Sequence, residues 1–483
     1  MTKITQAINF KFYGREAELK LLESYYSQQE SRLITIYGRR RIGKSALIEE
    51  FSRNKVLYKF MGLPPDKNIS ATDQRASFAK TLSSYGLPEI KTEDWSDLFK
   101  LLALKIEGKQ AVIVFDEISW MALEDPTFLP KLKSDWDECF KNKSQVLLIL
   151  CGSVSSWIQK NILSSTGFVG RIDHVIELKP LGLKDCNAFW KDREITPYEK
   201  LKVLCVTGGV PLYINAFDVS QPFEKNIERL CLTPGGLLLR EFDVIFNDLF
   251  DKRAGLYKKI VESLISGPKD TRQIAESIQW EPSGVLTDYL NDLVTAGFIS
   301  RDFLWDFQSG ALGKLSRYRL SDNYLRFYLR CLQPHKEKIE QRGLNTPFLS
   351  LLDLPSWPSI LGLQLENLVL QNRELIWESL GYSARDIVSD NPFFQKKNTQ
   401  QAGCQIDYLI QTRHHNLIIC EIKFSKNLIS SEIIQEVKNK IKNLKHPKSF
   451  SCFPVLIHAN EVQESVRDSQ IFMKIINLGD FLN

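Results

Sequence analysis

The sequence predicts a multidomain α/β protein, in which a parallel-sheet core is followed by helical segments and by a second, C-terminal α/β domain. Three observations support this fold class. A β-branched run, a glycine-rich loop and a helical pattern follow one another over residues 33–51. Two further runs, 110–116 and 145–152, have the continuous apolar pattern of buried parallel strands. Two more apolar runs lie far downstream, between 404 and 424, and 483 residues exceed one domain of about 150.

Composition limits the class of protein. Hydrophobic residues make up 43% of the chain and charged residues 25%, as in globular proteins, and the net charge is +5. No apolar run approaches the roughly 18 residues that span a bilayer, and the N-terminus lacks the pattern of a signal peptide. The nine cysteines include no CxxC pair, and the six histidines are not placed to complete a zinc site. We therefore expect a cytoplasmic protein with free thiols and no membrane partner.

The segment RLITIYGRRRIGKSALIEEF, residues 32–51, carries the strongest motif. Its two glycines, lysine and serine have the full P-loop spacing between a predicted strand and a predicted helix. The glycines let backbone N–H groups surround the phosphates of ATP, and the helix N-terminus adds partial positive charge. Lys44 would reach the β- and γ-phosphates, and the Ser45 hydroxyl would bind Mg²⁺. The predicted cofactor-binding residues of this loop are Gly38, Arg41, Gly43, Lys44, Ser45 and Ala46.

An acidic pair follows the apolar run of the segment QAVIVFDEISW, residues 110–120. Acidic side chains at the carboxyl end of a buried parallel strand lie at the ligand-binding edge of the sheet. This segment resembles a Walker B motif, in which Asp116 would hold Mg²⁺ and Glu117 would polarise the attacking water. The alternative is an acidic helix cap that follows a core strand.

Two further polar residues are candidates for contact with the nucleotide. Ser153 ends the third buried strand, where related ATPases place a residue that senses the γ-phosphate; it could equally cap the next helix. Arg171, in GFVGRIDHVIEL, is either an arginine finger or sensor, or one half of a surface salt bridge.

The order of these motifs resembles that of archaeal-type P-loop ATPases of the AAA+/STAND branch. The matching segments are FYGREAEL, GRRRIGKS, VIVFDE, LCGS, GR and TGGVPLYI, and they span roughly residues 10–330. The resemblance implies an ATP-dependent switch with a core over residues 1–180 and a helical lid over 181–250, in which Pro211 approaches the nucleotide. The arginine run 39–41 departs from the pattern, and its role is open between nucleotide and partner contact.

Residues 251–332 have the order of a winged helix, with three helical patterns followed by two strands. The third helical pattern carries Asp288 and Asp292, and no lysine or arginine lies between Arg272 and Arg301. Repulsion from phosphates should oppose its entry into a DNA groove. A structural or coupling role is therefore favoured over base readout, and 333–355 is predicted as a linker.

The segment CQIDYLIQTRHHNLIICEIKFSKN, residues 404–427, predicts a hairpin with charges on apolar strands. A turn centred on His414 pairs Asp407 with Glu421, and directly opposed residues have Cβ atoms about 5 Å apart. The period of two places Lys423 on the same face. Opposed buried carboxylates need compensation. Either a local salt bridge to Lys423 or a divalent cation between the carboxylates could provide it.

The pattern D-x13-E-x-K on adjacent strands, after a helix that bears a glutamate, resembles the PD-(D/E)xK restriction-endonuclease-like fold. The resemblance covers residues 356–483 and implies a Mg²⁺ site with Glu366, Asp407 and Glu421 as ligands. Asp407, Glu421 and Lys423 would be its catalytic residues. Ile406 precedes Asp407, so the leading PD dipeptide is absent.

Local charge bears on the partner. Residues 391–450 contain ten Lys or Arg and four Asp or Glu, a local charge of +6. Such a surface suits contact with a DNA backbone, and a solvated lysine face is the alternative. The favoured function is an ATP-hydrolysing switch coupled to a metal-dependent, DNA-cleaving C-terminal domain. The alternatives are a STAND-type regulatory ATPase whose C-terminal domain binds DNA or protein without cleavage, and a transcription regulator. A homo-oligomer or a partner protein is compatible with each.

Overall fold

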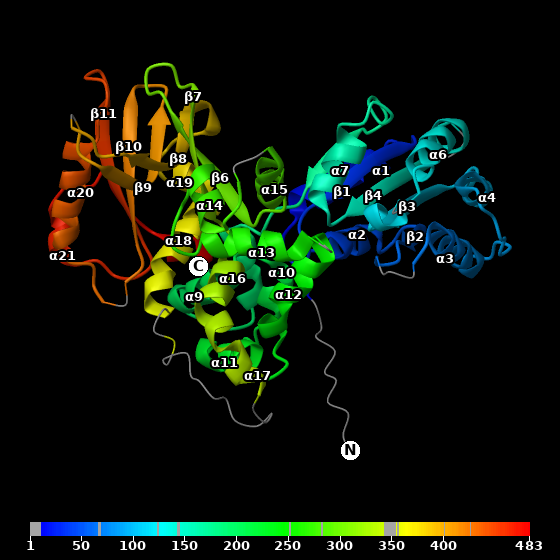
Figure 1. Cartoon of the computed structure of the whole chain (residues 1–483), viewed down its shortest axis with the longest axis horizontal. Coiled ribbons are helices and arrows are strands. Elements are labelled where there is room, and N and C mark those ends of the chain that lie inside the picture. The colour runs from blue at the N-terminus through cyan, green and yellow to red at the C-terminus, as the bar shows by residue number, and fades with distance from the viewer. Residues whose placement is uncertain are drawn as a thin grey trace. The chain divides into compact units, whose positions relative to one another are not determined.

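The computed structural model describes residues 11–65, 69–122, 125–142, 145–250, 253–281, 284–341, 354, 357–399, 401–425 and 427–483. The chain divides into two compact units, one over Gly14–Lys179 and one that joins Met1–Tyr13 to Pro180–Asn483. Figure 1 shows the elements of both units. In the described part of the chain, no helix is long and apolar enough to cross a membrane.

The first unit is built on a five-stranded parallel sheet, as predicted. The strand order is β2-β3-β4-β1-β5. These strands are β1 (Arg32–Tyr37), β2 (Leu57–Met61), β3 (Gln110–Asp116), β4 (Gln145–Gly152) and β5 (His174–Glu177). Strands β1, β3 and β4 are buried almost throughout, because they occupy the middle of the sheet and have neighbours on both edges.

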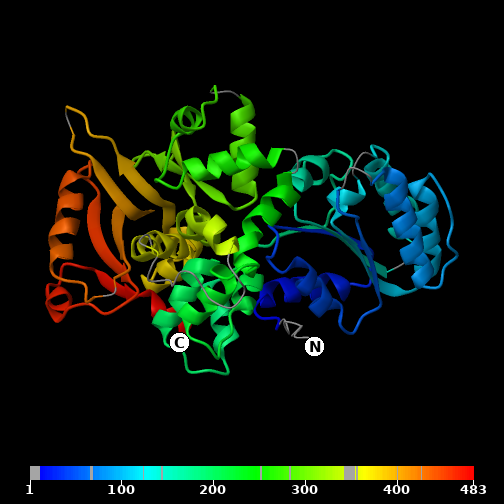
Figure 2. The same ribbon diagram turned by 60° about the horizontal axis from the view of Figure 1, so that its bottom comes forward.

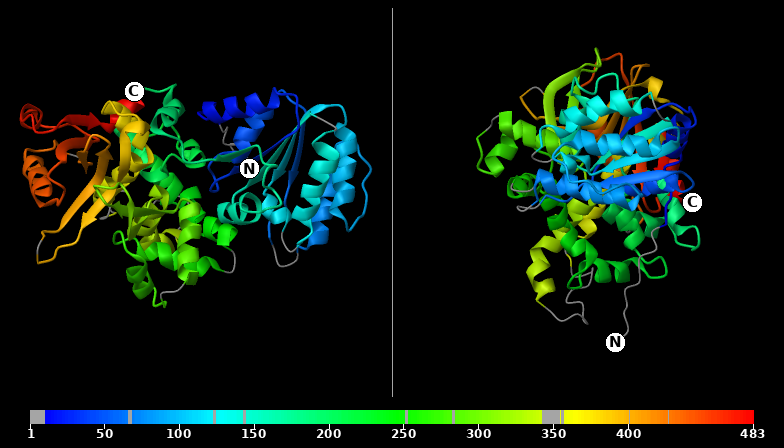
Figure 3. Two further views of the ribbon diagram at one scale, coloured as in Figure 1. Left: turned by 90° about the horizontal axis from the view of Figure 1, so that it is seen from above. Right: turned by 90° about the vertical axis from the view of Figure 1, so that its right-hand side faces the viewer.

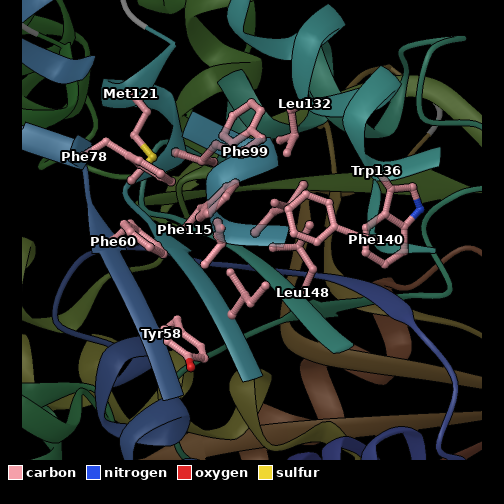
Figure 4. Close-up of a cluster of buried hydrophobic side chains, with 14 of the residues drawn as sticks. Tyr58, Phe60, Phe78, Phe99, Phe115, Met121, Leu132, Trp136, Phe140 and Leu148 are labelled. Atoms are coloured by element: carbon pink, nitrogen blue, oxygen red, sulfur yellow. The ribbon is translucent and has the colours of Figure 1, made fainter. Parts of the chain in front are cut away.

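Helices cover both faces of this sheet (Figure 3). They are α1 (Glu16–Tyr26), α2 (Lys44–Ser52), α3 (Ala71–Ser84), α4 (Trp95–Ile106), α5 (Ile118–Met121), α6 (Phe128–Asp135) and α7 (Ser155–Ile158). On one face, aromatic side chains of α3, α4 and α6 pack against β2 and β3; the rings of Phe60 and Phe78 stack with centroids 4.0 Å apart (Figure 4). This packed core fixes the carboxyl ends of the strands, where the predicted nucleotide-binding residues lie.

Arg15 ties both ends of the first unit together. It is 7% exposed and adopts a left-handed conformation (φ 65°) immediately before α1. Its Nη2 donates to the carbonyl oxygens of Ile42 (3.2 Å) and Lys179 (2.5 Å). The entry of the chain into the unit and its exit are therefore joined through one guanidinium, next to the P-loop.

The second unit begins with helices and a two-stranded sheet. Its first helices are α8 (Leu183–Asn187), α9 (Pro197–Thr207), α10 (Pro211–Ala216), α11 (Phe223–Cys231) and α12 (Leu237–Phe250). Three helices and two antiparallel strands then follow in the predicted order: α13 (Ala254–Ser263), α14 (Thr271–Ser277), α15 (Gly284–Thr295), β6 (Ile299–Trp305) and β7 (Leu312–Leu320). Their identity as a winged helix stays a prediction.

The predicted linker begins with short helices, η6 (Gln333–His335) and α17 (Lys336–Glu340), and most of its remainder lies outside the described residues. The predicted lid, winged helix and C-terminal domain all fall in one compact unit, so the boundaries among them stay predictions. A buried polar network joins them. Asn323, on α16 (Asn323–Phe327), donates to the carbonyl oxygens of Leu204 on α9 and Gln364 on α18 (Trp357–Gln371). Asn367 of α18 donates to Asn323 Oδ1 (2.9 Å).

A mixed five-stranded sheet forms the C-terminal part of this unit, in the order β12-β11-β10-β9-β8. Its strands are β8 (Ile387–Gln395), β9 (Cys404–Thr412), β10 (Asn416–Lys423), β11 (Ser451–His458) and β12 (Lys474–Asn477). Strands β8, β9 and β10 are antiparallel, whereas β10, β11 and β12 are parallel. The pairing of Leu409 with Ile419 confirms the register predicted from a turn centred on His414.

Helices flank the C-terminal sheet on both sides (Figures 1 and 2). One side has α18 (Trp357–Gln371) and α19 (Arg373–Ser379), and the other has α20 (Glu432–Asn443). The short α21 (Glu464–Asp468) packs with α20 through Val466. The start of β9 and the end of β10 lie together between these helices, which places the predicted C-terminal site there.

Candidate functional sites

The P-loop joins β1 to α2 through two glycines that the backbone requires. A Cβ on Gly38 would lie 2.4 Å from the Leu178 carbonyl oxygen. Gly43 has φ 93° and immediately precedes α2, whose first residue is Lys44. The loop therefore directs the N-terminus of a nine-residue helix at the space above the sheet. Ala46 lies in the first turn of this helix.

Lys44 is 6% exposed, and its ammonium is fully engaged by protein acceptors. Nζ donates to the carbonyl oxygens of Gly38 (2.8 Å) and Arg39 (3.0 Å) and to Ser153 Oγ (2.9 Å). Burial lowers the pKa of Lys44, and the nearby Cys151, Glu117 and Asp116 oppose this effect. These contacts hold the charge at the position where a phosphate would enter.

The predicted magnesium-binding pair is in contact. Ser45 Oγ donates to Asp116 Oδ2 over 3.1 Å, and Asp116 is 2% exposed. Lys59, from β2, brings its Nζ to 3.3 Å from the same oxygen and to 3.3 Å from Glu49. Burial lowers the pKa of Lys59, but the two carboxylates outweigh burial and raise it overall. The contact of Lys59 with Asp116 was not predicted, although a lysine in the middle of a core strand indicates that a buried acidic partner is near.

Ser153 connects Lys44 to Glu117. Its Oγ donates to Glu117 Oε1 (2.6 Å) and its backbone N–H donates to Glu117 Oε2 (3.1 Å), while Oγ also accepts from Lys44. Glu117 adopts a left-handed conformation (φ 52°) directly after β3, which turns its carboxylate toward Ser153. The side chain of Ser153 does not cap α7, whose N-cap is Val154. The alternative that Ser153 caps the next helix is therefore wrong.

Arg171 lies elsewhere, and its placement corrects the prediction that it contacts nucleotide in its own chain. Its Nε and Nη2 bind the Asp137 carboxylate over 2.7–3.0 Å, which is the salt-bridge alternative. It lines a pocket of about 510 Å³ with Arg32 and Asp173, at the amino ends of the strands. The P-loop is at the opposite, carboxyl ends, so the parallel sheet separates Arg171 from Lys44.

The other predicted contacts have diverse surroundings. Arg40 lies over the Trp120 ring at 5.2 Å, and the exposed Arg41 has φ 70°. Pro211 occupies the first turn of α10 and follows Gly208 and Gly209, both with positive φ. It belongs to the second unit, and its approach to nucleotide stays a prediction.

In the C-terminal sheet, Asp407, Glu421 and Lys423 converge as predicted from the hairpin. Glu421 is 1% exposed, and its Oε1 lies 3.0 Å from Lys423 Nζ. Lys423 is also bound to Glu436 (2.9 Å). Asp407 Oδ2 accepts the Ile422 backbone N–H (3.0 Å), so this aspartate binds the neighbouring strand through its side chain. Burial and the Glu421 charge raise the pKa of Asp407.

A second lysine, Lys440 from α20, completes this cluster. Its Nζ lies 2.5 Å from Glu421 Oε2 and 3.5 Å from Asp407 Oδ1. Burial lowers the pKa of Lys440, but Asp407 and Glu421 outweigh it and raise the pKa above its usual value. In the sequence, Lys440 was only one of the ten basic residues counted over 391–450. It shares the inner face with Ile433, Val437 and Leu444, and this helical spacing was the available signal.

The three predicted metal ligands of this domain, Glu366, Asp407 and Glu421, are not arranged around one point. Among the residues that the structure describes, no group of three or more His, Cys, Asp or Glu side chains is arranged to hold a metal ion. Glu366 is near enough to Asp407 for that charge to act on it; burial first, and Asp407 second, raise the pKa of Glu366 to about 7. The Lys440 ammonium, rather than the Glu366 carboxylate, accompanies Asp407 and Glu421 in this cluster. The predicted site of three carboxylates around one metal ion is therefore not formed.

A P-loop, an acidic pair after a neighbouring parallel strand and a serine that joins them define the class of P-loop ATPases. Residues 12–217 match the model of an ATPase domain found predominantly in Archaea. The match extends past β5 through α9 and α10.

Known proteins agree with this assignment. An uncharacterized protein of Methanocaldococcus jannaschii is 28% identical over 330 residues, which make up 68% of this chain and 71% of that protein. A second protein of this organism, described as an uncharacterized ATP-binding protein, is 46% identical over 44 residues, or 9% of this chain and 75% of its own length. The Walker-type ATPase of Pyrococcus abyssi has a similar fold, with a TM-score of 0.52 and 16% identity; the likeness covers 66% of this chain and 96% of that one.

Proposed function

We propose that the first unit binds ATP with Mg²⁺ and hydrolyses it as a nucleotide-controlled switch. The observation that carries this proposal is the bridge of Ser153 between Lys44 and Glu117. A hydroxyl and a carboxylate suit Mg²⁺, which keeps several of its waters, and Ser45 and Asp116 supply this pair. The bound cation would neutralise charge on the β- and γ-phosphates.

The bridge gives Ser153 a defined part in the switch. The γ-phosphate offers oxygens that compete for the Lys44 ammonium and for the Ser153 hydroxyl. Once Ser153 donates to the phosphate, Glu117 loses its 2.6 Å partner. Its carboxylate is then free to orient the attacking water and accept a proton from it. ATP binding would thereby release Glu117 from Ser153 for its part in hydrolysis.

Nucleotide binding and turnover of three variants test this proposal. We expect Lys44→Ala to lose ATP binding and Glu117→Gln to bind ATP without turnover. Ser153→Ala should bind ATP but hydrolyse it about 10²-fold more slowly, in the range of a lost catalytic hydrogen bond. Full turnover by Glu117→Gln would show that Glu117 does not activate the water. Normal turnover by Ser153→Ala would show that the contact of Ser153 with Lys44 and Glu117 has no part in hydrolysis.

We propose as a second function that the C-terminal domain cleaves DNA with a divalent cation. The convergence of Asp407, Glu421 and Lys423 supports it, together with the mixed sheet between α18 and α20. Asp407 and Glu421 would hold the cation, without Glu366, and it would lower the pKa of a bound water. Lys423, fixed by Glu436, would stabilise charge on the attacked phosphate.

The surface around this site supports a DNA partner. Lysines 438, 442, 445 and 448 of the α20 region are exposed, as are 396 and 397 at the end of β8. Contact with backbone phosphates through lysine carries little sequence information. Asp288 is exposed on α15, which supports the expectation that α15 does not enter a groove.

The alternative is a STAND-type regulatory ATPase whose C-terminal domain binds DNA or protein without cleavage. The neutralisation of Glu421 by two lysines is the observation that favours it. Incubation of plasmid DNA with Mn²⁺ separates the two functions. Cleavage by wild type that Asp407→Asn and Lys423→Ala both lose, with ATPase activity kept, supports the nuclease. Equal cleavage by these variants would show that the cleavage comes from a contaminant or another site, and no cleavage by wild type supports the regulatory alternative.

A further inference from the structure

Two lysines neutralise the C-terminal carboxylates, but they are held differently. Lys423 is two residues from Glu421 on β10 and is fixed by Glu436 on its other side, at 2.9 Å. Lys440 reaches the cluster from α20, and its ammonium is the group that contacts both Glu421 (2.5 Å) and Asp407 (3.5 Å). Lys440 therefore stands between the two carboxylates, where a shared divalent cation would bind.

The buried charges of this cluster balance without a metal. Asp407 and Glu421 contribute two negative charges, and Lys423 and Lys440 contribute two positive ones. Glu436, which is 52% exposed, adds a third carboxylate on the outer side of Lys423. A divalent cation that enters beside Lys440 would leave an excess of positive charge in a site where Glu421 is 1% exposed and interactions are weakly screened. For a cation to bind there, Lys440 would have to leave, and its side chain, which is 24% exposed, already reaches solvent from α20.

We propose that Lys440 is a positioning residue that occupies the cation position until a DNA phosphate draws its ammonium away. The divalent cation and DNA then bind cooperatively. This inference rests on the proposed metal-dependent function of the C-terminal domain. A phosphate at the rim provides the negative charge that Lys440 loses when it leaves the carboxylates. By linkage, DNA must raise the affinity for the cation by the same factor by which the cation raises the affinity for DNA.

Calorimetric titration of the full chain with Mn²⁺, with and without a short DNA duplex, measures this coupling. The heat that Asp407→Asn abolishes defines the C-terminal site and separates it from the nucleotide site. In wild type we expect DNA to lower the Mn²⁺ Kd about tenfold, which corresponds to about 1.4 kcal/mol. In Lys440→Met the Kd without DNA should already be about tenfold lower, and DNA should change it little.

Two variants control for folding and for general charge. Lys440→Arg keeps the positive charge and should retain the weak, DNA-dependent binding of wild type. Lys438→Met removes an exposed charge from the same helix and should leave the Mn²⁺ Kd without DNA unchanged. Equal Mn²⁺ affinity in wild type and a folded Lys440→Met protein would overturn the role of Lys440 but keep the metal site. No Asp407-dependent heat in either protein would overturn the proposed metal site itself.

Discussion

At the scale of single residues, two buried glutamates of the C-terminal domain, Glu421 and Glu366, have different electrostatic surroundings. Glu421 is 1% exposed, and the ammonium groups of two lysines contact its carboxylate. Burial first, and the Asp407 charge second, raise the pKa of Glu366 to about 7, although Arg326, Arg319 and Lys440 act in the opposite direction. The difference follows from desolvation, which penalises a buried charge unless an opposite charge is within contact.

The raised pKa of Glu366 predicts that stability falls as the pH rises. The unfolded state releases this proton near 4.5, whereas the folded state keeps it to about 7. Between these values the folded state binds more protons, so each pH step upward favours unfolding. We expect wild type to lose about 2–3 kcal/mol more than Glu366→Gln between pH 5 and pH 8. Urea denaturation of both proteins at pH 5 and pH 8 measures this difference in the free energy of unfolding. Equal losses in wild type and Glu366→Gln would contradict the prediction.

Residue types and spacing predicted the P-loop and the acidic pair because both motifs are local in sequence. Lys59 and Lys440 were not predicted, although each binds a predicted acidic residue. Each reaches its carboxylate from another element, β2 or α20, and the approach depends on how these elements pack. For Arg171 the sequence left a nucleotide contact and a salt bridge open, and the structure has the salt bridge to Asp137. Its position after a turn does not reveal which edge of the sheet it reaches.

At the scale of elements, the hairpin of β9 and β10 shows how far a local rule extends. Alternation of apolar residues about His414 gave the correct register, because one face of each strand must be buried. His415 forms the turn with φ 58° and stacks on Phe450 at 4.8 Å. Which helices cover the two faces, and hence that α20 contributes a lysine, is decided by tertiary contacts.

Gln411 joins this hairpin to the two-stranded sheet of β6 and β7. It is 3% exposed, accepts the Trp305 Nε1–H (2.6 Å) and donates to the Phe307 carbonyl oxygen (2.8 Å). Gln411→Leu would leave both groups buried without a partner, so we expect a loss of about 1–3 kcal/mol in the free energy of unfolding. Gln405→Leu, exposed on the same strand, should change it by less than about 0.5 kcal/mol in urea denaturation. Equal losses of stability in Gln411→Leu and Gln405→Leu would argue against a stabilising role for the Gln411 hydrogen bonds.

At the scale of the whole molecule, the division at residues 14–179 predicts two unfolding events. The predicted lid, winged helix and C-terminal domain share one unit and a buried network through Asn323, so they should unfold together. Scanning calorimetry should show two transitions. A nonhydrolysable ATP analogue with Mg²⁺, at about 100 times its Kd, should stabilise the unit with the P-loop by about 2.7 kcal/mol and leave the other in place. One transition that shifts as a whole would contradict this independence.

The chain passes between the two units twice, at residues 13–14 and 179–180. Arg15 binds the Lys179 carbonyl oxygen, so the two passages lie side by side, and the same guanidinium binds Ile42 within the P-loop. A phosphate that displaces the P-loop would therefore also act on the hydrogen bond to Lys179, so nucleotide state can reach the point where the chain leaves the first unit through a single side chain.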